Sequence, residues 1–114
     1  MEKTAQIEIL IDSREQIPYL FSQRIRVAAA TLAAGDYGLR GYETEIAVER
    51  KSLADFVSTI ILRRERFKAE LKKLQTYKAA CIVVEAFPHD ILNRSYSSNA
   101  APEAVWQSAI SIII

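Results

Sequence analysis

Residues 35–51 read GDYGLRGYETEIAVERK, and this segment decides the fold. Two stretches of it, 35–40 and 44–51, carry strand-forming residues on either side of a turn, which predicts an antiparallel β-hairpin. If the turn is centred on Tyr42 and Glu43, residues that face each other across the hairpin have numbers that sum to 85. This pairing determines which polar side chains meet at the open end of the hairpin.

The predicted pairing brings two carboxylates together. Asp36 is expected directly opposite Glu49, with the two Cβ atoms about 4.5–5.5 Å apart. Side chains alternate along a strand, so Glu49 and Lys51 share one face while Arg50 points to the other. Two facing carboxylates repel each other unless a cation or a proton lies between them. Hard oxygen ligands at this spacing suit Mg²⁺ or Mn²⁺, and Lys51 can hold a phosphate or the attacking water.

Two further aspartates are placed to reach the same site. Asp12 ends a predicted strand, and Asp55 lies in the first turn of a predicted helix. Carboxylates and a lysine at a strand end are the groups needed for metal-assisted hydrolysis of a phosphodiester, because the metal polarises the phosphate and lowers the pKa of bound water. The same spacing also fits a solvated hairpin face with a Glu–Lys ion pair, and the spacing alone does not separate the two interpretations.

The remaining patterns predict alternating strands and helices. Before the hairpin we expect a strand at 6–12, a short helix at 16–23 with Pro18 near its start, and a strand at 26–32. After the hairpin we expect a helix with Ser52 as N-cap and a second helix over about 64–78, whose apolar stripe holds Phe67, Leu71, Leu74 and Tyr77. A buried strand at 79–85 and a last helix beginning at Pro102 follow. This order predicts an α/β domain with a mixed central sheet flanked by helices on both faces.

Composition limits the class of protein. A chain of 114 residues suits a single domain, and a net charge of +1 means that any nucleic-acid surface must be local. Cys81, the single cysteine, lies in an apolar run and is expected to be a buried thiol. No signal peptide or apolar run of about 18 residues is present, so we expect an intracellular protein with no membrane segment. The apolar ending at 108–114 favours a domain that lacks its C-terminal end.

Four segments together resemble the XPF family of structure-specific endonucleases. They are IDSRE at 11–15, LAAGDYGL at 32–39, VERKSLAD at 48–55, and RERFKAELKKL at 64–74 followed by IVVE at 82–85. The third segment matches the hallmark Glu-Arg-Lys-x-x-x-Asp of that family, and all four occur in the family's order. The resemblance implies a restriction-endonuclease-like nuclease core over residues 1–114 that cuts one strand of branched, flapped or forked DNA in repair or recombination, with Mg²⁺ or Mn²⁺ as cofactor.

The resemblance also implies roles for individual residues. Asp36, Glu49 and Asp12 would be the metal ligands and Lys51 the catalytic lysine, while Arg50 and Asp55 would complete the acidic and basic shell of catalytic residues. Arg14 would contact DNA, and the role of Glu15 is left open. Glu85, at the end of a predicted strand, either supports the metal shell or caps the next turn.

The predicted helix at 64–78 is locally basic. Over residues 63–78 there are seven Arg or Lys against two Glu. Arg64, Lys68 and Lys72 follow a four-residue spacing, which fits either a DNA-contacting face or a solvated one. Arg66 and Phe67 resemble an Arg-Phe pair of the family, which favours DNA contact for Arg66 and a core position for Phe67.

The chain also departs from the family. Many members carry a tandem helix-hairpin-helix module after the nuclease core, and none is present here, so branch preference and dimer geometry stay open. The form fits a short bacterial or phage member. Expected partners are branched DNA and a second subunit, identical or related, in the cytoplasm or nucleoid, or in the nucleus of a eukaryote. The alternatives are a non-catalytic DNA-binding or scaffold partner of a nuclease, and a restriction-type nuclease without branch preference.

Overall fold

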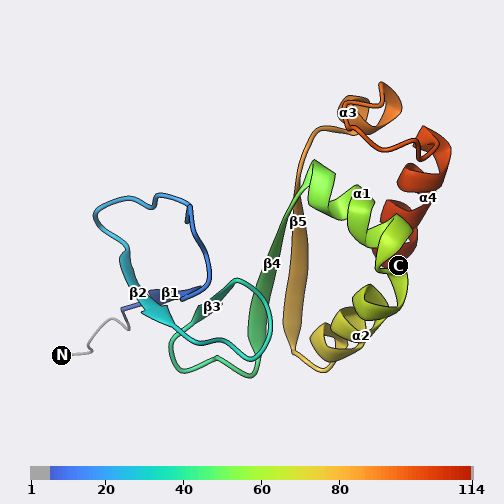
Figure 1. Ribbon diagram of the computed structural model, residues 1–114. Coiled ribbons are helices and arrows are strands. Elements are labelled where there is room, and N and C mark those ends of the chain that lie inside the picture. The colour runs from blue at the N-terminus through green and yellow to red at the C-terminus, as the bar shows by residue number, and fades with distance from the viewer. Residues whose placement is uncertain (1–5, 114) are drawn as a thin grey trace. The chain divides into compact units, whose positions relative to one another are not determined.

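The computed structural model describes residues 6–113, with side chains described as far as residue 109 (Figure 1). Its elements are β1 (Glu8–Asp12), β2 (Arg26–Ala30), β3 (Tyr37–Leu39), β4 (Ile46–Ser52), α1 (Leu53–Leu62), α2 (Arg64–Gln75), β5 (Ala79–Glu85), α3 (Pro88–Leu92) and α4 (Pro102–Ile113). The predicted α/β class is confirmed. Most of the apolar ending, for which we expected a missing C-terminal part, lies outside the described side chains.

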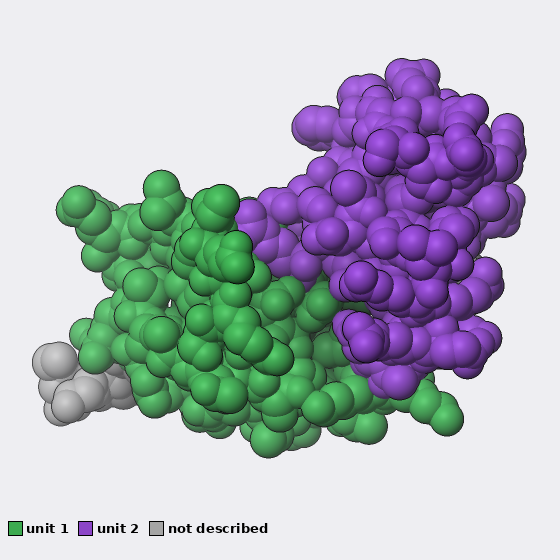
Figure 2. All heavy atoms as spheres, in the orientation of Figure 1, with its two compact units in different colours: residues 1–49, 72–82 green, residues 50–71, 83–114 purple. Residues whose placement is uncertain are grey.

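The five strands form one mixed sheet in the order β2-β1-β3-β4-β5. β1 runs parallel to β2, with Glu8 opposite Arg26, and antiparallel to β3, with Leu10 opposite Gly38. β3 in turn runs antiparallel to β4. The chain folds as two compact units, Met1–Glu49 with Lys72–Ile82 and Arg50–Leu71 with Val83–Ile114, which Figure 2 colours separately.

The hairpin formed by β3 and β4 has the predicted register. Tyr37 pairs with Val48, whose numbers sum to the expected 85. The connection is longer than a two-residue turn, because the backbone N–H groups of Glu45 and Ile46 both donate to the Tyr42 carbonyl oxygen at 2.9 Å. These bonds hold the loop closed without changing which residues of β3 and β4 face each other.

Gly35 makes the close approach of the chain to β4 possible. Its φ is +78°, a left-handed conformation that residues with a Cβ rarely adopt. A Cβ at this position would lie 3.0 Å from the Val48 carbonyl oxygen and 3.2 Å from the Ala47 Cβ. The glycine therefore lets the next residue, Asp36, donate its backbone N–H to the Val48 carbonyl oxygen at 2.8 Å.

The segment between β1 and β2 is a loop, so the predicted helix at 16–23 is wrong. Tyr37 of β3 organises this loop. Its ring stacks on Tyr19 at a centroid distance of 5.4 Å and meets the edge of Phe21 at 6.2 Å. The Tyr37 hydroxyl oxygen accepts a hydrogen bond from the Tyr19 backbone N–H at 2.9 Å, which a helix would have used internally. Contacts to a strand that is distant in sequence thus override the local helical preference.

The helices of the second unit follow the predicted signals, with one addition. Ser52 caps α1, because its hydroxyl oxygen accepts the Asp55 backbone N–H at 3.1 Å. The core of this unit holds Phe56, Val57, Ile60, Phe67, Ile91 and Val105. The short helix α3 was not predicted, although the Asp90 carboxylate accepts the Phe87 N–H at its start, a local capping signal. Between residues 6 and 113 no helix is long and apolar enough to span a bilayer.

β5 is not the buried strand that its apolar sequence predicts. None of its seven residues is buried, and Val83 is 40% exposed. Cys81 is exposed too, so the prediction of a buried thiol is wrong. The physical reason is that β5 ends the strand order, because an edge strand has a neighbour on one side only.

Replacing Tyr37 by Phe tests the anchoring of the loop. The hydroxyl group is buried, donates to the Glu15 carboxylate at 3.0 Å and accepts the Tyr19 N–H, whereas the ring contacts do not need it. We expect Tyr37→Phe to lower the free energy of unfolding by about 1–2 kcal/mol, measured by urea denaturation. Tyr42→Phe is the matched control, because Tyr42 is 51% exposed and should change stability by less than about 0.5 kcal/mol. Equal effects of the two substitutions would contradict this account.

Candidate active site

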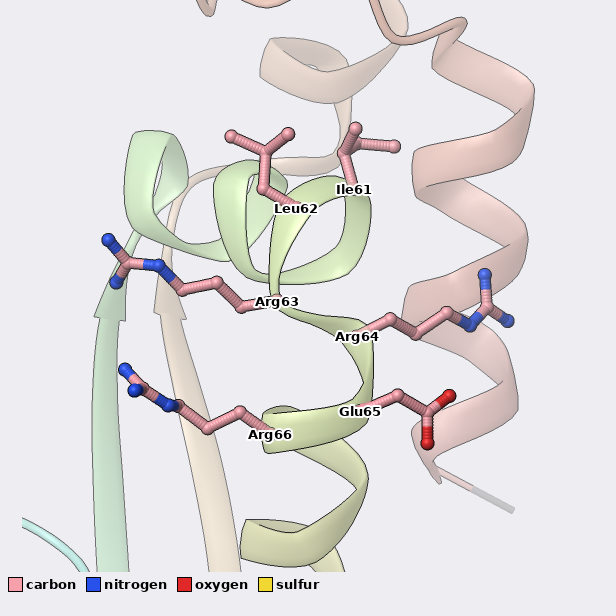
Figure 3. Close-up of a pocket in the computed structure, with 6 residues that line it drawn as sticks. All are labelled: Ile61, Leu62, Arg63, Arg64, Glu65 and Arg66. Carbon is pink, nitrogen blue, oxygen red and sulfur yellow. The ribbon is translucent and has the colours of Figure 1, made fainter.

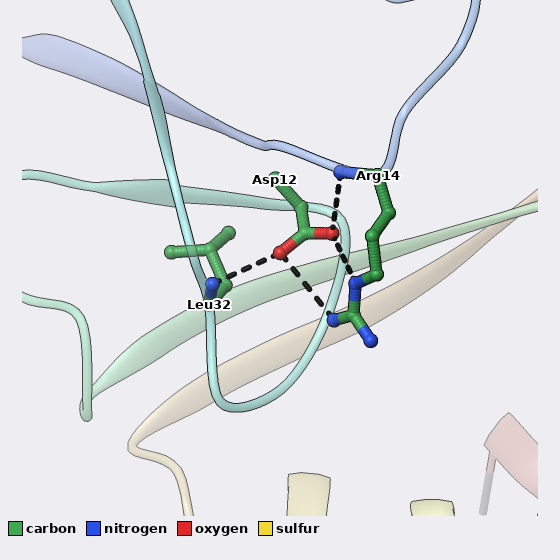
Figure 4. A network of polar contacts seen from close by, with 3 residues as sticks. All are labelled: Asp12, Arg14 and Leu32. Atoms are coloured by element: carbon green, nitrogen blue, oxygen red, sulfur yellow. Dashed lines mark hydrogen bonds and ion pairs between the residues drawn. The ribbon is translucent and has the colours of Figure 1, made fainter.

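Asp12 is the most buried charged residue described, with 2% of its surface exposed. It ends β1, and both carboxylate oxygens accept hydrogen bonds (Figure 4). One oxygen accepts from the Leu32 N–H at 2.9 Å, and the other accepts from the Arg14 N–H at 3.1 Å and from the Arg14 Nε at 2.8 Å. The first oxygen also lies 3.4 Å from a terminal guanidinium nitrogen of Arg14. The carboxylate is therefore held in one orientation inside the protein.

Arg14 connects Asp12 to the other predicted carboxylates. The hydrogen bonds from its guanidinium group lower the pKa of Asp12, which keeps this aspartate ionised despite its burial. The same bonds raise the pKa of Arg14, and the negative charges of Asp36 and Glu49 raise it further. Three carboxylates thus share the field of one arginine whose side chain is 75% exposed. The structure brings together four of the residues that the sequence predicts for the site.

Asp36 and Glu49 lie at the open end of the hairpin. Both are half-buried, and they flank the Tyr37–Val48 pair at the same end of the hairpin, because Asp36 precedes Tyr37 and Glu49 follows Val48. Over the described part of the chain, no group of three His, Cys, Asp or Glu side chains is arranged to hold a metal ion. A pair of carboxylates nevertheless suits Mg²⁺, which commonly uses one or two carboxylates together with waters and substrate phosphates. The donors present therefore fit a two-carboxylate site better than a three-carboxylate one.

Lys51 and Arg50 belong to the second compact unit. The Lys51 ammonium lies over the ring of Phe67, with the Nζ atom 5.9 Å from the ring centroid. Arg50 forms an ion pair with Glu85 of β5, with Nε and Oε2 3.1 Å apart, and its side chain is only 20% exposed. This pair gives Glu85 a structural partner, which neither interpretation of the sequence had included.

Two other acidic residues have local structural roles. Asp55 lies in the first turn of α1, where its N–H binds the Ser52 hydroxyl and its negative charge suits the positive end of the helix dipole. Glu15 accepts the hydroxyl group of Tyr37. Whether Asp55 also takes part in catalysis stays a prediction.

The basic residues of α2 do not form a single row. A pocket lies where α1 ends and α2 begins, and Figure 3 shows Arg63 and Arg66 pointing to one side of it and Arg64 to the other. Glu65 extends beside Arg64, and its carboxylate pairs with Lys68 at 3.5 Å. The predicted DNA-binding residues of this helix are therefore divided between two sides, and the side with Arg64 and Lys68 carries a neutralising carboxylate.

The mixed sheet and its carboxylate group define the chain as an α/β protein of the restriction-endonuclease-like class. The ERCC4 domain matches residues 11–114, and the chain belongs to this family of domains. Among solved structures, XPF from Aeropyrum pernix aligns with a TM-score of 0.65 at 22% identity, covering 92% of this chain and 47% of that one. The chain thus spans about half the length of that structure. No curated protein matches it. The resemblance to the XPF family and the predicted fold are confirmed.

Sequence reasoning missed how these residues are connected. It identified Arg14 as a DNA contact and did not predict that Arg14 would bind Asp12, although a two-residue separation at a strand end allows this contact. It treated Phe67 as core only, and the contact with Lys51 joins residues sixteen positions apart. The Lys51–Phe67 contact depends on how β4 and α2 pack, which no local sequence pattern encodes.

The Asp12–Arg14 pair should stabilise the fold in a pH-dependent way. Because the pKa of Asp12 is lowered in the folded state, this contribution is present above the ordinary Asp pKa of about 4 and is lost as the pH falls through the lowered value. We expect Arg14→Ala to lower the free energy of unfolding only modestly at pH 7, because the Arg14 side chain is largely exposed.

Urea unfolding of both proteins between pH 7 and about pH 2.5 measures this effect, and the difference should shrink toward the acid end. Arg24→Ala is the control, since Arg24 is an exposed arginine of the same loop. A stability difference that is the same across the whole pH range would show that Arg14 does not act through the Asp12 carboxylate.

Proposed function

We propose that this chain is the nuclease core of a divalent-metal-dependent endodeoxyribonuclease that hydrolyses a phosphodiester bond at branched, flapped or forked DNA inside the cell. The observation that carries the proposal is the contact of Asp12 with Arg14, together with the charges of Asp36 and Glu49 that act on the same guanidinium group, within a domain of the ERCC4 family. Carboxylates that lie close to one another repel unless a cation or a proton lies between them. We infer the class of reaction from the family and the location of the active site from the carboxylates.

Asp36 and Glu49 are the residues that would hold the metal. Asp12 has its oxygens satisfied by Arg14 and Leu32, so we assign it first to fixing the geometry of the site and only second to ligation. Bound there, Mg²⁺ or Mn²⁺ would polarise the scissile phosphate and lower the pKa of a bound water. Two side-chain ligands leave room for a phosphate oxygen of the substrate.

The chain's own residues supply the positive charge around the phosphate. Lys51 follows Glu49 by two positions on β4, so strand alternation turns both side chains to one face. Its ammonium group would orient the attacking water or stabilise the charge that develops on phosphorus-bound oxygens. Arg14, exposed beside the carboxylates, would contact the DNA backbone. Arg50 turns to the opposite face and, through Glu85, would serve the sheet rather than the reaction.

A cleavage assay tests the proposed function. Purified protein would be incubated with flap, fork, nicked and linear duplex DNA in Mg²⁺, in Mn²⁺ and in a chelator. The proposal is supported if the protein cleaves the branched substrates in Mg²⁺ or Mn²⁺ but not in the chelator, and if the products carry a 5′-phosphate and a 3′-hydroxyl. Equal cutting of linear duplex would favour a restriction-type nuclease, and binding without cutting would favour a scaffold partner. Sedimentation of the same samples would show whether one or two subunits bind the DNA.

Substitutions of Lys51 and Glu49 should have different effects on turnover and on metal binding. Lys51→Ala removes a charge-stabilising group and leaves the metal ligands intact, so turnover should fall at least about a hundredfold while metal still raises the melting temperature. Glu49→Gln should lose both turnover and the metal-dependent rise in melting temperature. The measurements are single-turnover cleavage and thermal unfolding with and without Mn²⁺. A Lys51→Ala protein that cuts at the wild-type rate would refute the proposed mechanism.

The two sides of α2 can be compared through the salt dependence of DNA binding. Each lost phosphate contact should flatten the slope of log K against log salt by roughly 0.9. Because Glu65 lies beside Arg64 and pairs with Lys68, we expect Arg63→Ala with Arg66→Ala to flatten the slope more than the triple change of Arg64, Lys68 and Lys72 to Ala. Fluorescence anisotropy between 50 and 200 mM salt would measure both slopes. Unchanged slopes in both variants would show that the basic residues of α2 face solvent and do not contact DNA.

A further inference from the structure

Lys51 is held against an aromatic ring inside the second compact unit. Its Nζ atom lies 5.9 Å from the centroid of Phe67, the fourth residue of α2. Phe67 is only 4% exposed, and its ring meets the edge of the Phe56 ring at a centroid distance of 6.4 Å and an interplanar angle of 88°. The ring beneath the ammonium group is therefore itself fixed by core packing.

This geometry has a physical consequence for the lysine. The face of an aromatic ring carries partial negative charge and attracts a cation placed above it within about 6 Å. A lysine side chain has four rotatable bonds, so without a partner it spreads over many rotamers. The Phe67 ring attracts the ammonium group and therefore limits the positions that it occupies.

We infer that Phe67 is a positioning residue for Lys51: its ring face holds the ammonium group at the end of β4, ready for the scissile phosphate or the attacking water. The inference rests on the proposed function for the role of Lys51. It gives Phe67 a task beyond filling the core, and it links the Glu-Arg-Lys strand to α2 through a contact that does not involve the metal ligands. Helix α2 thus contributes to the chemistry through a buried apolar residue as well as through its basic surface.

Nuclear magnetic resonance tests the contact without any cleavage assay. Protons above a ring face resonate upfield, so the ε-methylene signal of Lys51 should lie upfield of that of an exposed lysine such as Lys72. Phe67→Leu should move this signal back to the exposed position, and Phe67→Tyr, which keeps the ring, should leave it in place. Ile91→Ala is the control, since Ile91 is also buried in the core of this unit but lies on α3 and is not part of the Phe56–Phe67 ring pair.

Kinetics test the role of the contact. Phe67→Leu should lower kcat by roughly 3- to 30-fold, the range that corresponds to losing one cation–π contact, with little change in KM. Phe67→Tyr should cut within about twofold of the wild type, and Ile91→Ala should melt earlier but also keep kcat within about twofold. If Phe67→Leu does not fold, the inference is tested by the position of the Lys51 signal in the wild-type protein and by the activity of Phe67→Tyr.

Three results would overturn the inference. The first is a wild-type Lys51 signal at the position of an exposed lysine. The second is a Phe67→Leu protein whose signal has moved but whose kcat is unchanged, and the third is an equal loss of kcat in Phe67→Leu and Ile91→Ala. A wild-type protein that does not cut DNA would instead refute the proposed function, while the resonance of Lys51 would still show whether Phe67 holds the ammonium group.

Discussion

The pairing of Tyr37 with Val48 is the constraint on which the rest of the site depends. A slip of one residue in this antiparallel ladder would move Glu49 to the other face of β4 and away from Asp36. Gly35 protects the register, because a Cβ at this position would lie 3.0 Å from the Val48 carbonyl oxygen and the φ of +78° is rarely adopted by other residues. The Gly-Asp-Tyr sequence therefore works as a unit in which the glycine provides the approach, the tyrosine the pairing and the aspartate the charge.

Charge balance explains why the carboxylates can gather at all. Asp12 is buried and ionised because Arg14 and the Leu32 N–H supply donors to its oxygens, and Asp36 and Glu49 lie in the field of the same guanidinium group. An exposed arginine can swing away more easily than a buried one. The protein thus stabilises its negative charges with an exposed group, which under the proposed function would also contact a DNA phosphate.

Short-range signals made much of this structure predictable from the sequence. The hairpin register follows from a turn whose ends are close in the chain, and Ser52 and Pro102 begin their helices where capping rules place them. Most of the failures depend on distant neighbours, whereas the missed helix α3 and the missed Asp12–Arg14 contact are local. The loop after β1 is shaped by Tyr37 across the sheet, the exposure of Cys81 follows from the edge position of β5, and neither the Arg50–Glu85 pair nor the Lys51–Phe67 contact leaves a local pattern.

The hallmark Glu-Arg-Lys is contiguous because one strand can divide two tasks between its faces. Alternation turns Glu49 and Lys51 to one side, where the proposed mechanism has a metal ligand and a cation, and turns Arg50 to the other, where it bonds to Glu85 of the neighbouring strand. Loss of Arg50 would therefore loosen the junction of β4 and β5 without removing a reacting group. β4 passes directly into α1 through the Ser52 cap. A displacement of the β4 backbone at Arg50 would therefore also displace Lys51, the next residue. In the proposed mechanism Arg50 is therefore a structural residue between two reacting ones, because its bond to Glu85 fixes the strand that carries both.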